Sequence, residues 1–140
     1  MRAATRRAND PDDRHAQASI LPARDATLDA APDLPNFSDL SARFFRALGD
    51  PTRLRVLQLL LDAPAGEVSV SELVEALDAP QSRVSTHLGC LRWCGLVRAR
   101  REGKQVYYRV NDPRVREILT LGGAMIRDHA AGIASCEVVG

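Results

Sequence analysis

The stretch Gln81-Ser82-Arg83-Val84-Ser85-Thr86-His87-Leu88-Gly89-Cys90-Leu91-Arg92-Trp93-Cys94-Gly95 decides the fold that we predict for this chain. Within it, Val84, Leu88 and Leu91 recur at the i, i+4, i+7 spacing of one helical face, which predicts an amphipathic helix. Gly95 follows the last turn, where helices commonly end in the left-handed conformation. The stretch therefore predicts a short helix with one buried apolar stripe.

A second short helix is predicted immediately upstream. Ser69-Val70-Ser71-Glu72 fits a capping box, in which the serine oxygen and the glutamate each satisfy a free backbone N–H. The turn Asp78-Ala79-Pro80 then leads into the helix Gln81–Cys94. Two short helices joined by a tight turn are typical of a helix-turn-helix. The buried side of the upstream helix is expected to be formed by Leu73, Val74 and Leu77.

Two further helices are predicted before the helix-turn-helix. Apolar residues recur at helical spacing until Gly49 stops the first one: Phe37, Leu40, Phe44, Phe45 and Leu48. Asp50 is expected to cap the second helix, with Pro51 at its first position. The buried face of that second helix is expected to contain Leu54, Leu57 and Leu61, flanked by Val56 and Leu60.

A β-hairpin and a last helix are predicted after Gly95. Leu96–Arg100 and Val106–Val110 are rich in β-forming residues and flank a basic turn, residues 101–105, which predicts a wing. The last helix follows Asn111-Asp112-Pro113, and we expect it to form a homodimer interface with the first helix. The predicted fold is mainly α with a β-hairpin wing, a winged helix-turn-helix. Apolar and small residues share a face of the last helix: Val115, Ile118, Leu119, Gly122, Met125, Ile126 and, with them, His129.

Composition divides the chain into three expected segments. Residues 1–35, rich in Ala, Asp, Arg and Pro, are expected to be a disordered arm, because they bury too little apolar surface to offset the entropy of ordering. Residues 36–131 form the dimerising domain, and residues 132–140 form a tail that contains Cys136. The sequence shows no secretory signal and no apolar run long enough to cross a membrane, so we expect a cytoplasmic protein with reduced thiols.

Positive charge is concentrated around the predicted helix-turn-helix and wing. The whole chain has a formal net charge of +1, whereas residues 81–109 contain seven basic residues and one acidic residue, a net charge of +6. Such an uneven distribution is typical of a phosphate-binding face and predicts double-stranded DNA as the partner. The expected DNA-binding residues on the helix are Gln81, Ser82, Arg83, Ser85, Thr86 and His87, and those on the wing are Arg101, Lys104 and Gln105.

The order of these elements, together with Ala47-Leu48-Gly49-Asp50-Pro51-Thr52-Arg53-Leu54-Arg55-Val56-Leu57, resembles the ArsR/SmtB family of metal-sensing winged-helix repressors. The resemblance covers about residues 37–127, and its other specific parts are Ser85-Thr86-His87-Leu88, Gly95-Leu96-Val97 and Glu102–Tyr108. It implies a dimer that binds an inverted-repeat operator and dissociates when an inducer binds. It does not imply an enzyme.

The family places its metal sites in different elements, so we assign the site from the residues of this chain. Residues 69–77 contain no cysteine, and the last helix offers only His129 beside Asp128, so neither of those two family sites is expected. Cys90 and Cys94 are four residues apart, which places them on one helical face. With Cys136 they resemble the CmtR-type branch, which implies a cadmium or lead site.

Alternatives for the three cysteines remain open. Thiolates are soft ligands that select soft ions, so Cd(II) or Pb(II) is favoured, while Hg(II) and As(III) are close competitors. Cys90 and Cys94 could instead be small buried apolar residues, or form a redox-sensitive disulfide, although the helical spacing would strain that bond. A thiol enzyme is disfavoured, because His87 near Cys90 lacks an orienting third group.

Overall fold

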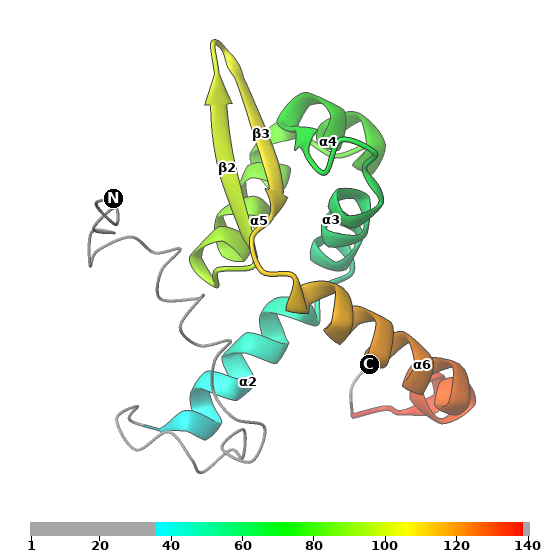
Figure 1. The fold of residues 1–140 in the computed structure, drawn as a ribbon. Helices are drawn as coiled ribbons and strands as arrows, with labels where there is room; N and C mark the ends of the chain where they lie inside the picture. Colours follow the sequence, from blue (N-terminus) through cyan, green and yellow to red (C-terminus); the bar gives the residue numbers. More distant parts are fainter. Residues whose placement is uncertain (1–35, 139–140) are drawn as a thin grey trace, which may run out of the picture.

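The computed structural model describes residues 36–138, so the arm expected at residues 1–35 and the last two residues of the tail lie outside the described residues. Within this range, helices alternate with three short strands (Figure 1). The elements are α2 (Phe37–Leu48), α3 (Pro51–Asp62), β1 (Val68–Ser69), α4 (Val70–Leu77), α5 (Gln81–Trp93), β2 (Val97–Glu102), β3 (Gln105–Val110) and α6 (Arg114–Ser135). This order confirms the mainly α, winged helix-turn-helix fold.

Local signals position the helix ends close to where they are predicted. The Asp50 side chain accepts a hydrogen bond of 3.0 Å from the backbone N–H of Arg53 and caps α3. The capping box at the start of α4 is also present, with Ser69 and Glu72 bonded in both directions. Gly95, at φ +76°, follows α5 in the left-handed conformation. Helix α5 ends at Trp93, one residue earlier than predicted, and Cys94 is its C-cap.

The wing belongs to a three-stranded antiparallel sheet with the order β1-β3-β2. Strand β3 pairs with β2 along the hairpin, from Val97 opposite Val110 to Glu102 opposite Gln105. Gly103, at φ +59°, allows the tight turn between them. The short strand β1, which the sequence analysis did not predict, pairs Val68 with Tyr108 and so ties the base of the wing to α4.

The hydrophobic core lies between α3, α4, α5 and the base of the wing. The predicted stripe of α5 is buried, since Val84 and Leu91 are 0% exposed and Leu88 is 1% exposed. On α3 the prediction was partly wrong: Leu54 is 38% exposed, and the buried residues are Val56, Leu57 and Leu60. Helix α3 turns the face with Val56, Leu57 and Leu60 toward the core, so its buried face is rotated about the helix axis relative to the predicted one.

Helices α2 and α6 extend from the body on the side opposite the wing tip (Figure 1). The first turns of α6 pack on the core through Val115, Ile118 and Leu119. The rest of α6 and part of α2 expose large apolar side chains: Leu40, Phe45, Leu121, Met125, Ile126 and Ile133. Helix α6 bends at His129 and continues to Ser135, so it extends into the segment expected to be a tail, and Cys136 is its C-cap.

Candidate DNA-binding face and thiol pair

The N-terminal part of α5 presents a polar surface over a buried apolar stripe. Five of the expected DNA-binding residues are exposed there: Gln81, Ser82, Arg83, Ser85 and Thr86. Helix α5 begins at Gln81, and its N-cap Pro80 makes no side-chain cap; the Pro80 carbonyl accepts hydrogen bonds from the N–H groups of Arg83 and Val84 at 3.0 and 3.1 Å. The Thr86 hydroxyl donates its hydrogen to the Ser82 carbonyl at 2.9 Å, so the Thr86 oxygen is left to accept a hydrogen bond from a bound partner. The exposed residues form a continuous face suited to base edges.

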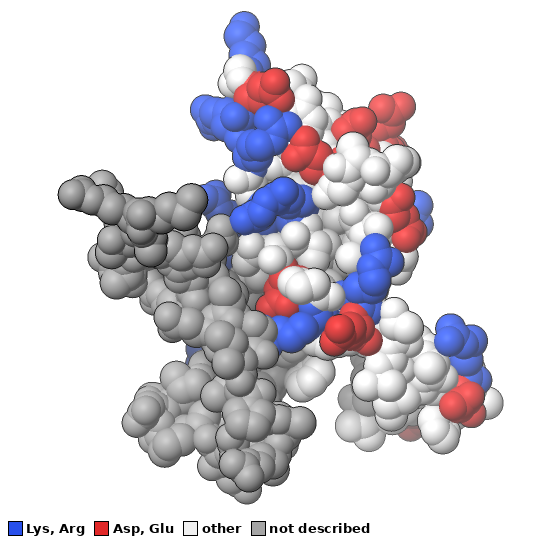
Figure 2. Space-filling view, in the orientation of Figure 1, with Lys and Arg blue, Asp and Glu red and all other residues white. Residues whose placement is uncertain are grey.

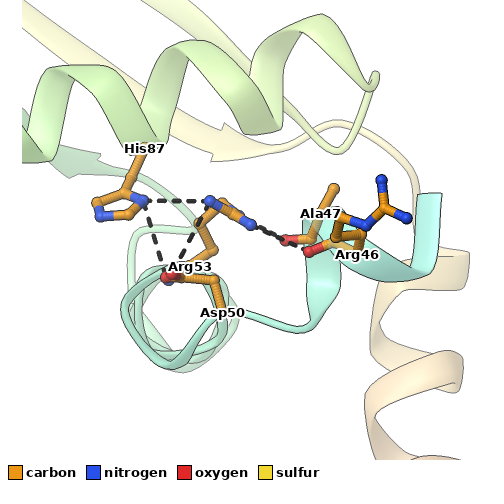
Figure 3. Close-up of polar contacts among 5 residues, drawn as sticks. All are labelled: Arg46, Ala47, Asp50, Arg53 and His87. Atoms are coloured by element: carbon orange, nitrogen blue, oxygen red, sulfur yellow. Dashed lines mark hydrogen bonds and ion pairs between the residues drawn. The ribbon is translucent and has the colours of Figure 1, made fainter. Parts of the chain in front are cut away.

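His87 differs from these five residues in its surroundings. Its side chain is only 17% exposed and points toward the N-terminal turn of α3 (Figure 3). The ring Nδ1 lies 3.4 Å from Nη1 of Arg53 and 3.7 Å from a carboxylate oxygen of Asp50. These contacts favour a packing role over the direct DNA contact expected for His87.

Asp50 and Arg53 were not among the residues singled out for function. The signal that could have suggested a link between them is their i, i+3 spacing in the first turn of a helix, which places their side chains together. Hydrogen bonding from the backbone N–H of Arg53 is the main cause that lowers the pKa of the Asp50 carboxyl; burial opposes it, and the neighbouring Arg53 and His87 side chains lower the pKa by smaller amounts. A negative carboxylate, a guanidinium and an imidazole therefore meet where α3 touches α5.

The wing tip carries exposed residues at all three predicted DNA-binding positions: Arg101, Lys104 and Gln105. Lys and Arg side chains gather over the hairpin, with acidic side chains among them (Figure 2). Arg100 is held further down the wing, because it pairs with Glu67 at 2.6 Å and Glu102 at 2.8 Å and stacks on the Tyr107 ring at 4.7 Å. Hydrogen bonds to the two glutamates raise the pKa of Arg100, so its charge serves to brace the wing.

Cys90 and Cys94 lie together at the C-terminal end of α5. Both thiols are free and half-buried, and Cys94 also packs against the core. Burial raises the pKa of the Cys94 thiol, and the neighbouring charge of Cys90 and a hydrogen bond with Cys90 raise it further, while the charge of Arg53 acts in the opposite direction. Two thiols this close are a suitable donor pair for one soft ion, and binding would release their protons.

Cys136 is not part of this pair within one chain. It caps the end of α6, where its N–H donates to the Ile133 carbonyl at 3.3 Å. Among residues 36–138, no three His, Cys, Asp or Glu side chains are grouped closely enough to hold a metal ion. The thiol pair therefore fits a soft ion only as a partial donor set within the described part of one chain. None of the helices in this part of the chain is long and apolar enough to span a bilayer.

Comparison with known proteins matches α3, the helix-turn-helix and the start of the first wing strand to one family. A family model described as "Bacterial regulatory protein, arsR family" matches residues 50–99. The chain is 49% identical over 98 residues to a "Probable mercury resistance operon repressor" of Streptomyces lividans. The aligned residues cover 70% of this chain and 76% of that protein. It is 47% identical over 78 residues to the "HTH-type transcriptional regulator CmtR" of Mycobacterium bovis, and here the aligned residues cover 56% of this chain and 64% of that protein.

The fold is also similar to a solved structure with a known assembly. The solution structure of a homodimeric winged helix-turn-helix domain of Mycobacterium bovis, a possible ArsR-family regulator, superposes with a TM-score of 0.59. That likeness has 30% sequence identity and covers 71% of this chain and 92% of the solved domain. Relatives and solved structure agree on a DNA-binding winged helix.

Proposed function

The chain belongs to the arsR family of bacterial regulatory proteins, and on that premise we propose that it is a homodimeric repressor released from its operator by a soft metal ion. The observation that carries the proposal is the division of α5 into two parts. Its N-terminal part exposes polar residues from Gln81 to Thr86, and its C-terminal end holds Cys90 and Cys94. In our proposal, an ion bound by the thiols at one end of this short helix shifts the DNA-binding residues at its other end.

The DNA-binding half of the proposal is supported by exposure and charge. Arg83 and Gln81 have side chains that can read guanine and adenine edges in the major groove. Arg101 and Lys104 are exposed at the wing tip, where they would bind phosphates or enter the minor groove. Two such units related by a twofold axis match an inverted-repeat operator.

The homodimer is supported by the apolar surface of α2 and α6. Large side chains that a monomer would leave in water are grouped on these two helices, including Phe45, which is 61% exposed, and Leu121, which is 66% exposed. Large apolar side chains left exposed on two helices support an interface there. The homodimeric assembly of the similar solved domain agrees with this assignment.

The metal half of the proposal rests on the thiols. Cys90 and Cys94 supply two ligands, and Cys136, from the partner subunit in our proposal, supplies the third. A soft ion bound by these thiolates would hold α5 and the end of α6 in an arrangement that fits DNA less well. Coupling of about 1–3 kcal/mol would weaken DNA binding about 5- to 150-fold. Cd(II) and Pb(II) suit three thiolates, while the mercury resistance relative favours Hg(II) as a second candidate.

Fluorescence anisotropy tests the proposal on reduced protein and labelled DNA from its own promoter. Titrations are repeated with Cd(II), Pb(II), Hg(II), arsenite and Zn(II) for the parent, Cys90→Ser, Cys94→Ser and Cys136→Ser. We expect one soft ion to release the parent but not the first two variants, and to release Cys136→Ser poorly. Trp93, the single tryptophan, precedes Cys94 and is 93% exposed, so its emission reports ion binding independently of DNA.

Two results would contradict parts of the proposal. If DNA binds tightly and no ion weakens it, the metal site is wrong, and release by an oxidant that a thiol reverses would favour the redox alternative. If Cys136→Ser binds the ion and releases DNA like the parent, the third ligand is not Cys136. A parent protein without affinity for its promoter DNA would refute the repressor itself.

A further inference from the structure

Trp93 is the last residue of α5, and 93% of it is exposed to solvent. It is the single tryptophan of the chain, and it makes no part of the hydrophobic core. Tryptophan combines a large apolar ring with one N–H donor, which is why it is enriched where proteins contact their partners. The position of Trp93 on α5 indicates which partner its ring would meet.

Trp93 continues the exposed face of α5 that begins with the proposed DNA-binding residues. Four exposed residues recur on this face at the i, i+4, i+7, i+11 spacing of a helix: Ser82, Thr86, Gly89 and Trp93. At 3.6 residues per turn, this face lies opposite the apolar stripe that packs on the core. The indole ring therefore extends the proposed DNA-binding face to the C-terminal end of the helix.

The charge of α5 matches a polyanion along this whole face. Arg83 and Arg92 are exposed and lie on either side of the face in the helical projection. The sequence of α5 contains no Asp or Glu that would repel phosphate groups. Charge complementarity therefore favours DNA over an apolar protein partner at Trp93.

Gly89 leaves the middle of the same face open. A Cβ built at Gly89 would meet nothing within 4 Å, so no neighbouring element occupies the space above the helix there. Glycine inside a helix is unfavourable, and it is often found where another molecule approaches the backbone closely. DNA can therefore come close to α5 between the side chains of Thr86 and Trp93.

The distance along the helix places Trp93 at the edge of the major groove. Seven residues separate it from Thr86, which is about 10 Å along the helix axis. The major groove is about 12 Å wide, so a helix whose first turns meet base edges brings its other end toward the sugar–phosphate backbone. The indole Nε1–H is a donor only, which suits a phosphate oxygen, and the ring suits the apolar surface of a deoxyribose.

We propose that Trp93 is a DNA-contacting residue: its ring packs on the sugar–phosphate backbone at the edge of the major groove, and its Nε1–H donates to a phosphate oxygen. This inference rests on the proposed function and adds a contact at the end of α5 opposite the base-reading residues. A phosphate contact fixes the position of the helix on the duplex and carries no sequence information itself. Trp93 thus strengthens binding to any duplex to the same extent.

The test compares the parent with Trp93→Ala, Trp93→Phe and Val138→Ala. Trp93→Phe keeps an aromatic ring without the N–H, and Val138, which is 95% exposed, provides an exposed apolar control away from α5. Anisotropy measures the affinity of full-length, reduced protein, with a chelator present, for a promoter duplex and for an unrelated duplex of the same length. The indole emission is recorded with and without unlabelled DNA. Analytical ultracentrifugation and thermal unfolding compare the assembly and the stability of the variants.

For Trp93→Ala we expect the affinity for both duplexes to fall by about tenfold or more, as for the loss of a hydrogen bond to a charged group. The ratio of the two affinities should stay unchanged, and so should their salt dependence, because the indole carries no charge. Trp93→Phe should fall between Trp93→Ala and the parent, and Val138→Ala should match the parent. The emission of the parent should change with the fraction of protein bound to DNA, while assembly and melting temperature stay the same in all variants.

Four results would overturn this inference. Trp93→Ala could bind both duplexes like the parent, or it could lose affinity for the promoter duplex alone, which would place the ring at base edges instead. A changed assembly in Trp93→Ala, or an emission typical of a buried indole before DNA is added, would assign Trp93 to a contact within the protein. A parent that binds neither duplex would refute the proposed repressor itself.

Discussion

Replacing Asp50 with alanine should lower the free energy of unfolding by about 1–1.5 kcal/mol. The cap that Asp50 provides to Arg53 N–H at 3.0 Å accounts for about 1 kcal/mol of this loss. Its ion pair with Arg53 at 4.0 Å and its contact with His87 at 3.7 Å add no more than about 0.5 kcal/mol, because the Asp50 side chain is 30% exposed. For a domain of this size the change corresponds to a melting temperature lower by about 4–10 °C.

Asp50→Asn separates the cap from the charge. Asparagine caps a helix about as well as aspartate, so this variant should lose only the contribution of about 0.5 kcal/mol from the ion pairs. The pKa of Asp50 is lowered in the folded protein, chiefly by the hydrogen bond from Arg53 N–H, from an ordinary value of 3.8. A lowered folded pKa means that the ionised carboxylate stabilises the fold above about pH 3.8 and that this contribution disappears as the pH falls through the folded value.

Urea denaturation of the parent and both variants, followed by circular dichroism at neutral pH and again toward pH 3, measures these differences. The gap between the parent and Asp50→Asn should close as the pH falls, while Asp50→Ala stays less stable than Asp50→Asn throughout. Equal losses for the two variants at neutral pH would refute the assignment of the larger share to the cap. No loss in Asp50→Ala would refute the whole account of how α3 begins.

Three further predictions concern the elements that position the DNA-binding face. Leu88→Ala should lower the free energy of unfolding by about 2–5 kcal/mol in urea denaturation, because Leu88 is 1% exposed in the core; a loss below about 1 kcal/mol would contradict its burial. Ser69→Ala should cost about 1 kcal/mol in the same assay by removing the cap of α4, and an unchanged midpoint would show that the capping box contributes nothing. Gly103→Ala should lower the free energy of unfolding by about 1–2 kcal/mol, because an alanine is strained at the φ of +59°. A steric clash does not contribute, since a Cβ there meets nothing within 4 Å. Gly103→Asn should cost less, and equal thermal shifts for the two substitutions would argue against backbone strain.

The folded elements could be predicted from the sequence because their signals are local. The capping residues Asp50 and Ser69, the apolar stripe of α5 and the left-handed Gly95 each depend on residues within about one helical turn or two, so spacing alone specifies them. The exposed polar start of α5 and the adjacent pair Cys90 and Cys94 follow from the same helical periodicity. These features made the winged helix-turn-helix and most of the candidate site predictable.

Contacts between distant segments depended on the tertiary structure. Arg53 and His87 are 34 residues apart, and Arg100 and Glu67 are 33 residues apart, so no local pattern pairs them. The same holds for the pairing of β1 with β3 and for the rotation of α3 that buries Val56 and leaves Leu54 at the surface. These contacts follow from how whole elements pack, because each helix can present more than one apolar face until its neighbours cover one of them. Helical periodicity alone determined that Cys90 and Cys94 lie together, whereas only the packing of α2, α3 and α5 decided that Arg53 contacts both the end of α2 and His87 on α5.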